Sequence, residues 1–317
     1  MTASNGLLEL VEAELAQPVS PGAHALAERI RARHGAAVRA VLFYGSCLRH
    51  GDDQDGVLDL YVLVEDYRSA YGSWTHAAMN RLLPPNVFYL EARVGDRLVR
   101  GKYAVLACRD FIRRTSARTF EPYFWARFSQ PCAFIYAADE QVRREVAAAL
   151  SSAILTTLGC VVPLVAPRFS SRELWTTTWR ETYRAEVRAE RPGMADALWA
   201  SAPDRYERVT RLALRALPFP TAADEANTPI MFTVFLPHAA ARRARRLWRI
   251  RRVYGKAMFL LRIMRNALTF EGGVDYVLWK IQRHSGVEVD HHWRERRHPL
   301  LALGAEAWRL YRSGAFR

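Results

Sequence analysis

The chain has 317 residues, which is enough for two or three domains and makes one large core less expected. Half of its residues are hydrophobic and a quarter are charged, the composition of an ordinary soluble globular protein. No uninterrupted apolar run reaches the roughly 18 residues that a membrane-spanning helix needs, so the sequence argues against a transmembrane protein.

The net charge of +14 is concentrated at one end of the chain. Residues 236–317 hold 18 Lys and Arg against 6 Asp and Glu, a balance of +12, whereas residues 1–235 hold 28 against 26, a balance of +2. A nearly neutral body with a basic C-terminal third favours an anionic partner there. Membrane lipid and nucleic acid are the two usual partners of such a region.

The cysteines and the N-terminus predict the compartment. The four cysteines lie in apolar stretches without C-x-x-C spacing, which favours a reducing compartment and argues against a zinc site or a disulfide framework. The N-terminal stretch is acidic and helical in pattern, unlike a signal or transit peptide. We therefore expect a cytoplasmic protein.

In chain order, the first 140 residues alternate between helix and strand patterns. Helix is predicted over 6–34, with a break at Pro18 and Pro21, and again over 66–81 and 109–128. β-branched and aromatic residues predict strands over 38–44, 57–64, 86–93, 99–107 and 132–137. The pair Gly95-Asp96 predicts a hairpin between the third and fourth of these strands.

The rest of the chain reads as helical. Residues 141–235 contain three helical patterns separated by Pro and Gly, and a winged-helix domain is one form that this region could take. Residues 242–268 combine apolar residues at helical spacing with a basic face. The expected fold class is α+β: a mixed sheet with flanking helices over 1–140, a helical domain over 141–235, and a basic amphipathic region over 236–317.

The stretch 41–66 contains the main candidate residues for binding a nucleotide and a metal ion. A strand leads into Gly45-Ser46, and the next strand, VLDLYVLV, places Asp59 among apolar residues. Glycine lets a backbone approach a phosphate, and the Ser46 hydroxyl and nearby N–H groups can bind its oxygens. A carboxylate on the next strand can hold Mg²⁺ that bridges nucleotide phosphates. The plainer alternatives are an ordinary Gly-Ser turn and an Asp59 that caps a helix or pairs with Arg49.

These residues resemble the nucleotidyltransferase β superfamily, and within it the mitochondrial-type phosphatidate cytidylyltransferase family, also called the translocator assembly and maintenance family. The resemblance covers about residues 40–137 and consists of motifs in the same order. They are Tyr44-Gly45-Ser46, Val57-Leu58-Asp59-Leu60, Val64-Glu65-Asp66, Gly101-Lys102-Tyr103-Ala104-Val105-Leu106 and the segment 123–131. Two departures are Tyr61 in place of the second acid and Ser129-Gln130 in place of His-Lys.

The resemblance implies a nucleotidyltransferase-type sheet and the reaction of CTP with phosphatidate, giving CDP-diacylglycerol and pyrophosphate. It implies that Asp59 and Lys102 are catalytic, that Mg²⁺ is the cofactor, and that Asp59 holds it. Glu91, and also Glu65 or Asp66, are candidates for a second metal contact. The resemblance also implies that the nucleotide is bound by Tyr44, Gly45, Ser46 and Arg127. Without the resemblance, the sequence favours a solvated position on a strand for Lys102. Arg127 could equally belong to a structural ion pair or to the site.

Three functions stay open at this point. The first is a peripheral enzyme on the inner face of the membrane, with residues 242–268 lying on anionic lipid and Trp248 near the headgroups. The second is a nucleotidyltransferase with a soluble or RNA acceptor, although we expect no nucleic-acid partner. The third is a degenerate transferase that only binds anionic surfaces, which the loss of the second acid allows. An ordinary packed helix is the plainer interpretation of residues 242–268.

Overall fold

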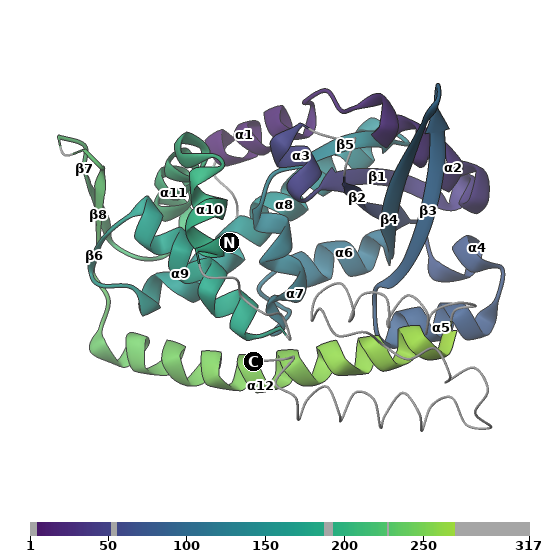
Figure 1. The fold of residues 1–317 in the computed structure, drawn as a ribbon. Coiled ribbons are helices and arrows are strands. Elements are labelled where there is room, and N and C mark those ends of the chain that lie inside the picture. The colour runs from purple at the N-terminus through teal and green to yellow at the C-terminus, as the bar shows by residue number, and fades with distance from the viewer. Residues whose placement is uncertain (1–4, 52–55, 187–192, 227, 270–317) are drawn as a thin grey trace.

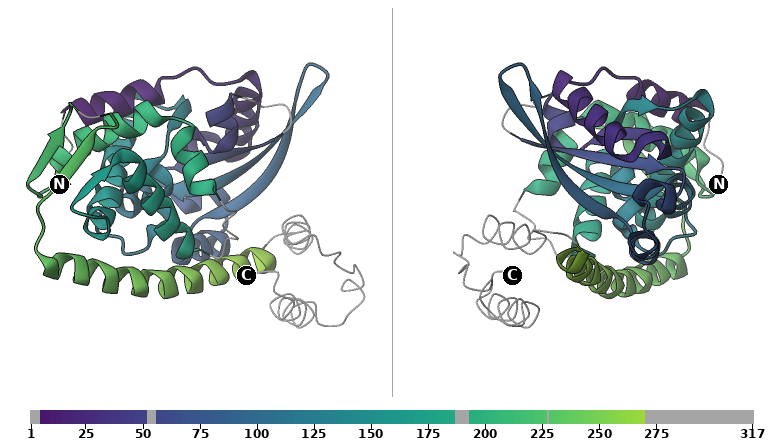
Figure 2. Two further views of the ribbon diagram at one scale, coloured as in Figure 1. Left: turned by 60° about the vertical axis from the view of Figure 1, so that its left-hand side comes forward. Right: turned by 90° about the vertical axis from the view of Figure 1, so that its right-hand side faces the viewer.

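Two sheets and twelve α-helices, joined by shorter 3₁₀ turns, make up the part of the chain that the structure describes (Figures 1 and 2). The structure is a computed structural model that describes residues 5–51, 56–186, 193–226 and 228–269. The fold is α+β, with a mixed five-stranded sheet flanked by helices, as the sequence predicts. The part of the predicted basic region beyond residue 269 lies outside the described residues.

The large sheet has the strand order β3-β4-β2-β1-β5. Its strands are β1 (Val38–Tyr44), β2 (Val57–Val64), β3 (Asn86–Val94), β4 (Arg97–Ala107) and β5 (Cys132–Ala137). β2 and β4 run parallel, and the other neighbours run antiparallel. Three of the five predicted strands have the bounds that their apolar patterns indicate. β3 and β4 are longer than predicted because the hairpin at Gly95 extends their pairing to Val94 and Arg97.

The helices of the first 140 residues cover both faces of this sheet. They are α1 (Asn5–Leu15), α2 (Pro21–His34), α3 (Ser46–His50), α4 (Tyr67–Tyr71), α5 (Trp74–Leu82), α6 (Cys108–Thr115) and α7 (Pro122–Trp125), with 3₁₀ turns η1 (Gly35–Ala37) and η2 (Arg127–Ser129). α2 begins at Pro21, as predicted, because the Ser20 side chain caps it. The predicted helix 66–81 is two helices, since left-handed Gly72 (φ 61°) ends α4.

α8 (Glu140–Val161) with the 3₁₀ turn η3 (Val162–Leu164) is the central helix of the molecule. It contacts α1, α6, α7, α9 and α11. The helical stretch over residues 140–164 is long and apolar enough to cross a membrane. However, 72% of its apolar 18-residue window is buried inside the protein. This helix therefore serves as the core against which the other helices pack.

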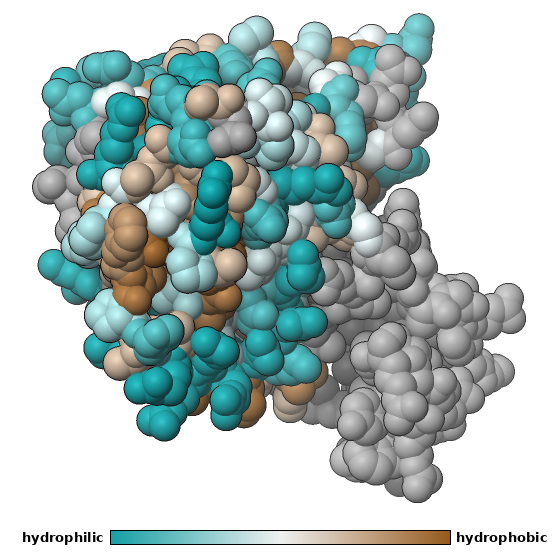
Figure 3. Space-filling view, turned by 90° about the vertical axis from the view of Figure 1, so that its left-hand side faces the viewer, coloured by the Kyte–Doolittle hydropathy of each residue, from teal (hydrophilic) through white to brown (hydrophobic). Residues whose placement is uncertain are grey.

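A second, three-stranded sheet is a feature that the sequence patterns do not predict. β6 (Arg168–Ser170) is followed by α9 (Ser171–Arg184), α10 (Met194–Ala200) and α11 (Pro203–Ala216), and then by the hairpin of β7 (Thr221–Asp224) and β8 (Met231–Val234). The strand order is β6-β8-β7. The three helical patterns predicted within 141–235 are present as α8, α9 and α11. The sequence patterns do not reveal the short strands beside them, because strands of three or four residues carry too little periodicity to be recognised. In Figure 3, hydrophilic side chains surround small apolar areas on this end of the molecule.

α12 (His238–Thr269) runs along one side of the molecule, from the second sheet to the end of α5 (Figures 1 and 2). Gly255 permits its close approach to α9, since a Cβ there would lie 2.3 Å from the carbonyl oxygen of Ala185. Trp248 is buried, packs edge-on against Trp125, and donates a hydrogen bond from Nε1 to the Cys160 carbonyl at 2.9 Å. The expectation that Trp248 lies near lipid headgroups is therefore wrong.

Candidate active site

The Gly45 turn lies directly against the Asp59 carboxylate. β1 and β2 pair antiparallel with Tyr44 opposite Asp59, so the end of β1 meets the start of β2. Gly45 has φ 92°, which L side chains rarely adopt, and a Cβ at this position would lie 2.7 Å from Asp59 Oδ2. The structure thus brings together the glycine and the acid that the sequence singles out, and glycine is required there for two independent reasons.

Lys102 is the partner that keeps the Asp59 charge within the sheet. β2 and β4 pair in parallel with Asp59 beside Lys102, and Nζ lies 2.9 Å from Oδ1. The Asp59 side chain is only 20% exposed, and the Lys102 ammonium offsets part of the cost of placing its charge there. The alternative partner Arg49 instead donates a hydrogen bond to Gln130 Oε1 at 3.1 Å.

Ser46 begins α3 and is exposed, with Gly45 as the residue before the helix. Tyr44, the residue before the turn, is half-buried and lies opposite Asp59 in the sheet, and its ring centre lies 5.3 Å from that of Tyr61. Tyr44 and Gly45 of the predicted nucleotide motif therefore lie next to Asp59, and Ser46 follows them at the start of α3.

Tyr61 stands two residues after Asp59, where the superfamily pattern has a second acid. Its side chain is fully buried, and its ring packs against Phe128 at 4.8 Å. Burial raises the pKa of Tyr61 far above its usual range, so the phenol is neutral. In the part of the chain that the structure describes, no three His, Cys, Asp or Glu side chains come together as a metal site. The second carboxylate of the pattern is therefore replaced by an aromatic contact.

Arg127 reaches the same cluster from η2. Nη1 donates a hydrogen bond to the Tyr61 hydroxyl at 3.3 Å, and the guanidinium carbon lies 5.9 Å from the Tyr44 ring centre. Nη2 also lies 4.0 Å from Glu186 Oε2. Burial by itself lowers the pKa of Arg127, but the phenols and the carboxylate around it outweigh burial and raise the pKa well above its ordinary value. Arg127 is thus a fixed cation beside the motif.

Glu91 does not join Asp59. It lies on the edge strand β3, where it is opposite Arg100, and its carboxylate accepts a hydrogen bond from the Tyr89 hydroxyl at 2.8 Å. Arg100 Nε lies 3.5 Å from the same carboxylate. The expectation of Glu91 as a second metal ligand is not supported by this geometry, because β4 separates β3 from β2 and directs Glu91 to Arg100 instead.

Two further residues of this region are Tyr123, which begins the segment 123–131 but is given no role by the sequence, and Arg262. The Arg127 and Arg262 guanidinium carbons lie 4.2 Å and 4.4 Å from the Tyr123 ring centre. The spacing of Tyr123 and Arg127, four residues apart in helical turns, is a signal that could have identified the first of these contacts. Arg262 comes from α12, and no pattern in the sequence connects it with the site.

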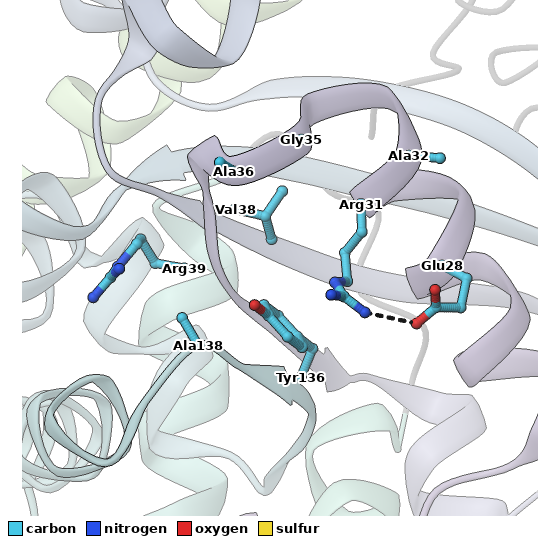
Figure 4. Close-up of a pocket in the computed structure, with 9 residues that line it drawn as sticks. All are labelled: Glu28, Arg31, Ala32, Gly35, Ala36, Val38, Arg39, Tyr136 and Ala138. Atoms are coloured by element: carbon cyan, nitrogen blue, oxygen red, sulfur yellow. Dashed lines mark hydrogen bonds and ion pairs between the residues drawn. The ribbon is translucent and has the colours of Figure 1, made fainter.

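A pocket of about 520 Å³ lies away from these residues (Figure 4). It is at the start of β1, whereas Asp59 lies by the end of that strand. Arg31 crosses it, stacked on the Tyr136 ring at 4.1 Å and paired with Glu28 at 2.9 Å. None of the predicted site residues lines this pocket.

The geometry of Asp59, Lys102, Gly45 and Arg127 stands without support from known relatives. Neither the models of known protein families nor the curated proteins contain a match to this chain.

Proposed function

We propose that the chain is a nucleotidyltransferase, and specifically that it transfers CMP from CTP to phosphatidate, giving CDP-diacylglycerol and pyrophosphate. The observation that carries the proposal is the contact of the Gly45 turn with the Asp59 carboxylate. A glycine that cannot carry a side chain, placed against a part-buried acid at the end of a strand, suits the binding of metal-bridged phosphates.

The residues present fit Mg²⁺ as the cofactor. Magnesium keeps several waters and is commonly held by one or two carboxylates together with substrate phosphates, so a single Asp59 carboxylate is a sufficient protein ligand. Asp59 Oδ2 faces the Gly45 turn, while Oδ1 pairs with Lys102. When bound, the ion would neutralise charge on the nucleotide phosphates.

The surrounding cations supply the rest of the chemistry. An oxygen of the phosphatidate phosphate attacks the α-phosphorus of CTP, and the bond between that phosphorus and the β-phosphate oxygen breaks, releasing pyrophosphate. The acceptor oxygen is already anionic, so no strong general base is required. Lys102 and Arg127 stabilise the charge that develops on the phosphates, and Gly45 and Ser46 hold the triphosphate.

The outer face of α12 supports a lipid acceptor. An ordinary surface helix buries its apolar residues and exposes its charges, but α12 buries Arg251, Arg262 and Arg265. Large apolar side chains on its outer face are more than 40% exposed, namely Ile250, Val253, Tyr254, Leu260, Leu261 and Met264. An exposed basic row, Arg242, Arg245, Arg249 and Lys256, accompanies them. This pairing of apolar stripe and basic row suits the surface of an anionic membrane, on whose inner face we place the protein.

One observation favours a second candidate. Lys102 neutralises Asp59, and Tyr61 fills the place of a second acid, which together suit a degenerate transferase that binds anionic surfaces without catalysis. A transferase with an RNA acceptor has no comparable support, because the charged row of α12 is interleaved with exposed apolar side chains that nucleic acid does not require.

The test is pyrophosphate release from CTP with Mg²⁺ and liposomes that contain phosphatidate. We expect release in the wild type, a CDP-lipid product, and a loss of at least about 100-fold in Asp59→Asn. Glu91→Gln is the matched control, an acid of the same sheet outside the site, and should keep full activity. CTP binding without release would indicate another acceptor, and no CTP binding by the wild type would leave the degenerate module.

A further inference from the structure

Tyr123 joins α12 to the candidate active site. Its ring is in contact with Arg127, which borders the nucleotide motif, and with Arg262, which comes from the helix whose outer face is apolar. Contacts of this kind between a cation and an aromatic ring fix both partners, and the effect grows when they are removed from water. The Tyr123 phenol is also close enough to Tyr61 and Arg127 to change the pKa of each.

Arg262 is held far more firmly than a surface arginine. Its guanidinium forms a two-pronged pair with the buried Glu121, one arm at 2.7 Å, and donates from Nε to the Pro84 carbonyl at 2.7 Å. Its side chain is 6% exposed and that of Glu121 is 5% exposed. A bidentate pair of this type fixes the orientation of both groups. Arg262 thus offers Tyr123 a rigid surface, supported by the loop that precedes β3.

The electrostatics of Tyr123 agree with this arrangement. Burial opposes the ionisation of its phenol, but the charges of Arg127 and Arg262 outweigh burial and lower its pKa. Both guanidinium groups on the ring therefore act on the phenol together. The Tyr61 hydroxyl accepts from Nη1 at 3.3 Å and the Tyr123 ring centre lies 4.2 Å from the guanidinium carbon, so a hydrogen bond and a ring face set the direction of Arg127.

We propose that Tyr123 is a positioning residue, held by Arg262 of α12, that fixes the Arg127 guanidinium for the nucleotide phosphates. This inference rests on the proposed function for its effect on CTP, but the positioning of Arg127 is a property of the protein without ligand. It makes α12 a structural part of the nucleotide site as well as the carrier of the exposed apolar stripe.

The first experiment requires no ligand. The hydrogen-exchange rate of the Arg127 Nε–H is measured by nitrogen-15 NMR, with the signal assigned by its loss in Arg127→Lys. We expect Tyr123→Leu to raise this rate about tenfold, because the ring contact with the buried cation is lost, and Tyr123→Phe, which keeps the ring, to restore a rate close to that of the wild type. The double variant Glu121→Met with Arg262→Met removes both members of the buried pair, and we expect a similar increase. Replacing both members avoids leaving a buried charge alone.

Tyr67→Leu is the matched control. Tyr67 is a buried tyrosine whose hydroxyl donates to Asp110 Oδ2 at 2.7 Å, so its replacement tests the general effect of removing a tyrosine ring from this domain. Exchange at Arg127 should be unchanged in this variant. An unchanged rate in both Tyr123→Leu and the Glu121/Arg262 double variant, each shown to be folded by circular dichroism, would overturn the proposal whether or not CTP is the substrate.

The second experiment measures the kinetics of CTP. We expect Tyr123→Leu to raise the KM for CTP about tenfold while kcat changes less, because Arg127 is misdirected rather than removed. The Glu121/Arg262 double variant should give the same change, and combining it with Tyr123→Leu should add little. If the Arg127 Nε–H exchanges faster but the KM for CTP is unchanged, the proposed role of Tyr123 in nucleotide binding is overturned. A wild type that does not use CTP would refute the proposed function alone, and the exchange rates would then decide the positioning role.

Discussion

Asp59 Oδ1 and Lys102 Nζ lie 2.9 Å apart on two parallel strands, although a helix pair and a hairpin separate these residues in the chain. The pair gives the part-buried acid a counter-charge within the protein itself. Under the proposed function, it also places a cation beside the nucleotide phosphates.

Replacing Lys102 with Met should separate its proposed catalytic role from its structural one. We expect kcat/KM for CTP to fall by about 100-fold, because a cation aimed at the phosphates is lost. The free energy of unfolding should fall by no more than about 1 kcal/mol, since the lysine is 37% exposed and solvent screens the pair. Steady-state kinetics and urea unfolding measure the two effects. Full activity in Lys102→Met would exclude the catalytic role, and Arg100→Met is the control on the same strand.

Replacing Gly45 with Ala should affect both stability and nucleotide binding. The new methyl group would meet Asp59 Oδ2 at 2.7 Å, and the backbone would hold alanine at φ 92°. We expect a loss of about 1–3 kcal/mol in the free energy of unfolding and the loss of measurable CTP binding. Gly35→Ala is the control, since Gly35 has φ 58° but open space around its Cβ. If the Gly45→Ala variant binds CTP as tightly as the wild type, phosphate does not approach this turn closely.

His34 predicts a dependence of stability on pH. Its Nδ1–H donates to the Ala70 carbonyl at 2.9 Å, so Nε2 accepts from the Tyr103 hydroxyl at 3.1 Å, and the ring is neutral. Burial is the main cause that lowers the pKa of His34 below 6.5. At a pH between the two pKa values, the unfolded chain therefore binds a proton at His34 and the folded chain does not. Stability conferred by the neutral ring is present above pH 6.5 and is lost as the pH falls towards the lower, folded pKa.

Urea unfolding at pH 7.5 and pH 5.5 measures this effect. The free energy of unfolding should drop between the two values in the wild type, and His34→Gln should remove part of that drop. His24→Gln serves as the control, because His24 is exposed. An equal drop in the wild type and in His34→Gln would show that other groups cause the pH dependence.

The outer stripe of α12 should be needed at a membrane but not for CTP binding. We expect Val253→Ser together with Leu260→Ser to weaken binding to liposomes of anionic lipid by about tenfold or more, because each exposed apolar side chain lost removes on the order of 1 kcal/mol of burial in lipid. Liposome flotation measures binding, and calorimetry with CTP and Mg²⁺ checks that the nucleotide site is intact. Leu98→Ser, at an exposed position on β4, is the control. Unchanged flotation would show that the exposed apolar side chains of α12 do not contact the lipid.

Local patterns in the sequence determine much of the fold. The bounds of β1, β2 and β5 follow from runs of β-branched and aromatic residues, and the helix break follows from Pro21. The meeting of Gly45 with Asp59 is also predictable, because the two strands that carry them are neighbours in the chain and pair with each other. Such features depend on residues close in sequence, whose conformational preferences act locally.

Only the tertiary structure decides which distant residues complete the site. The parallel pairing of β2 with β4 places Lys102 at Asp59 and leaves Glu91 to Arg100, and no local pattern specifies that strand order. The helical periodicity of α12 does not reveal that arginines face inward, because their burial depends on Glu121 and on carbonyl groups from a distant loop. Charges can be buried where such partners compensate them, and those partners come together only when the chain folds.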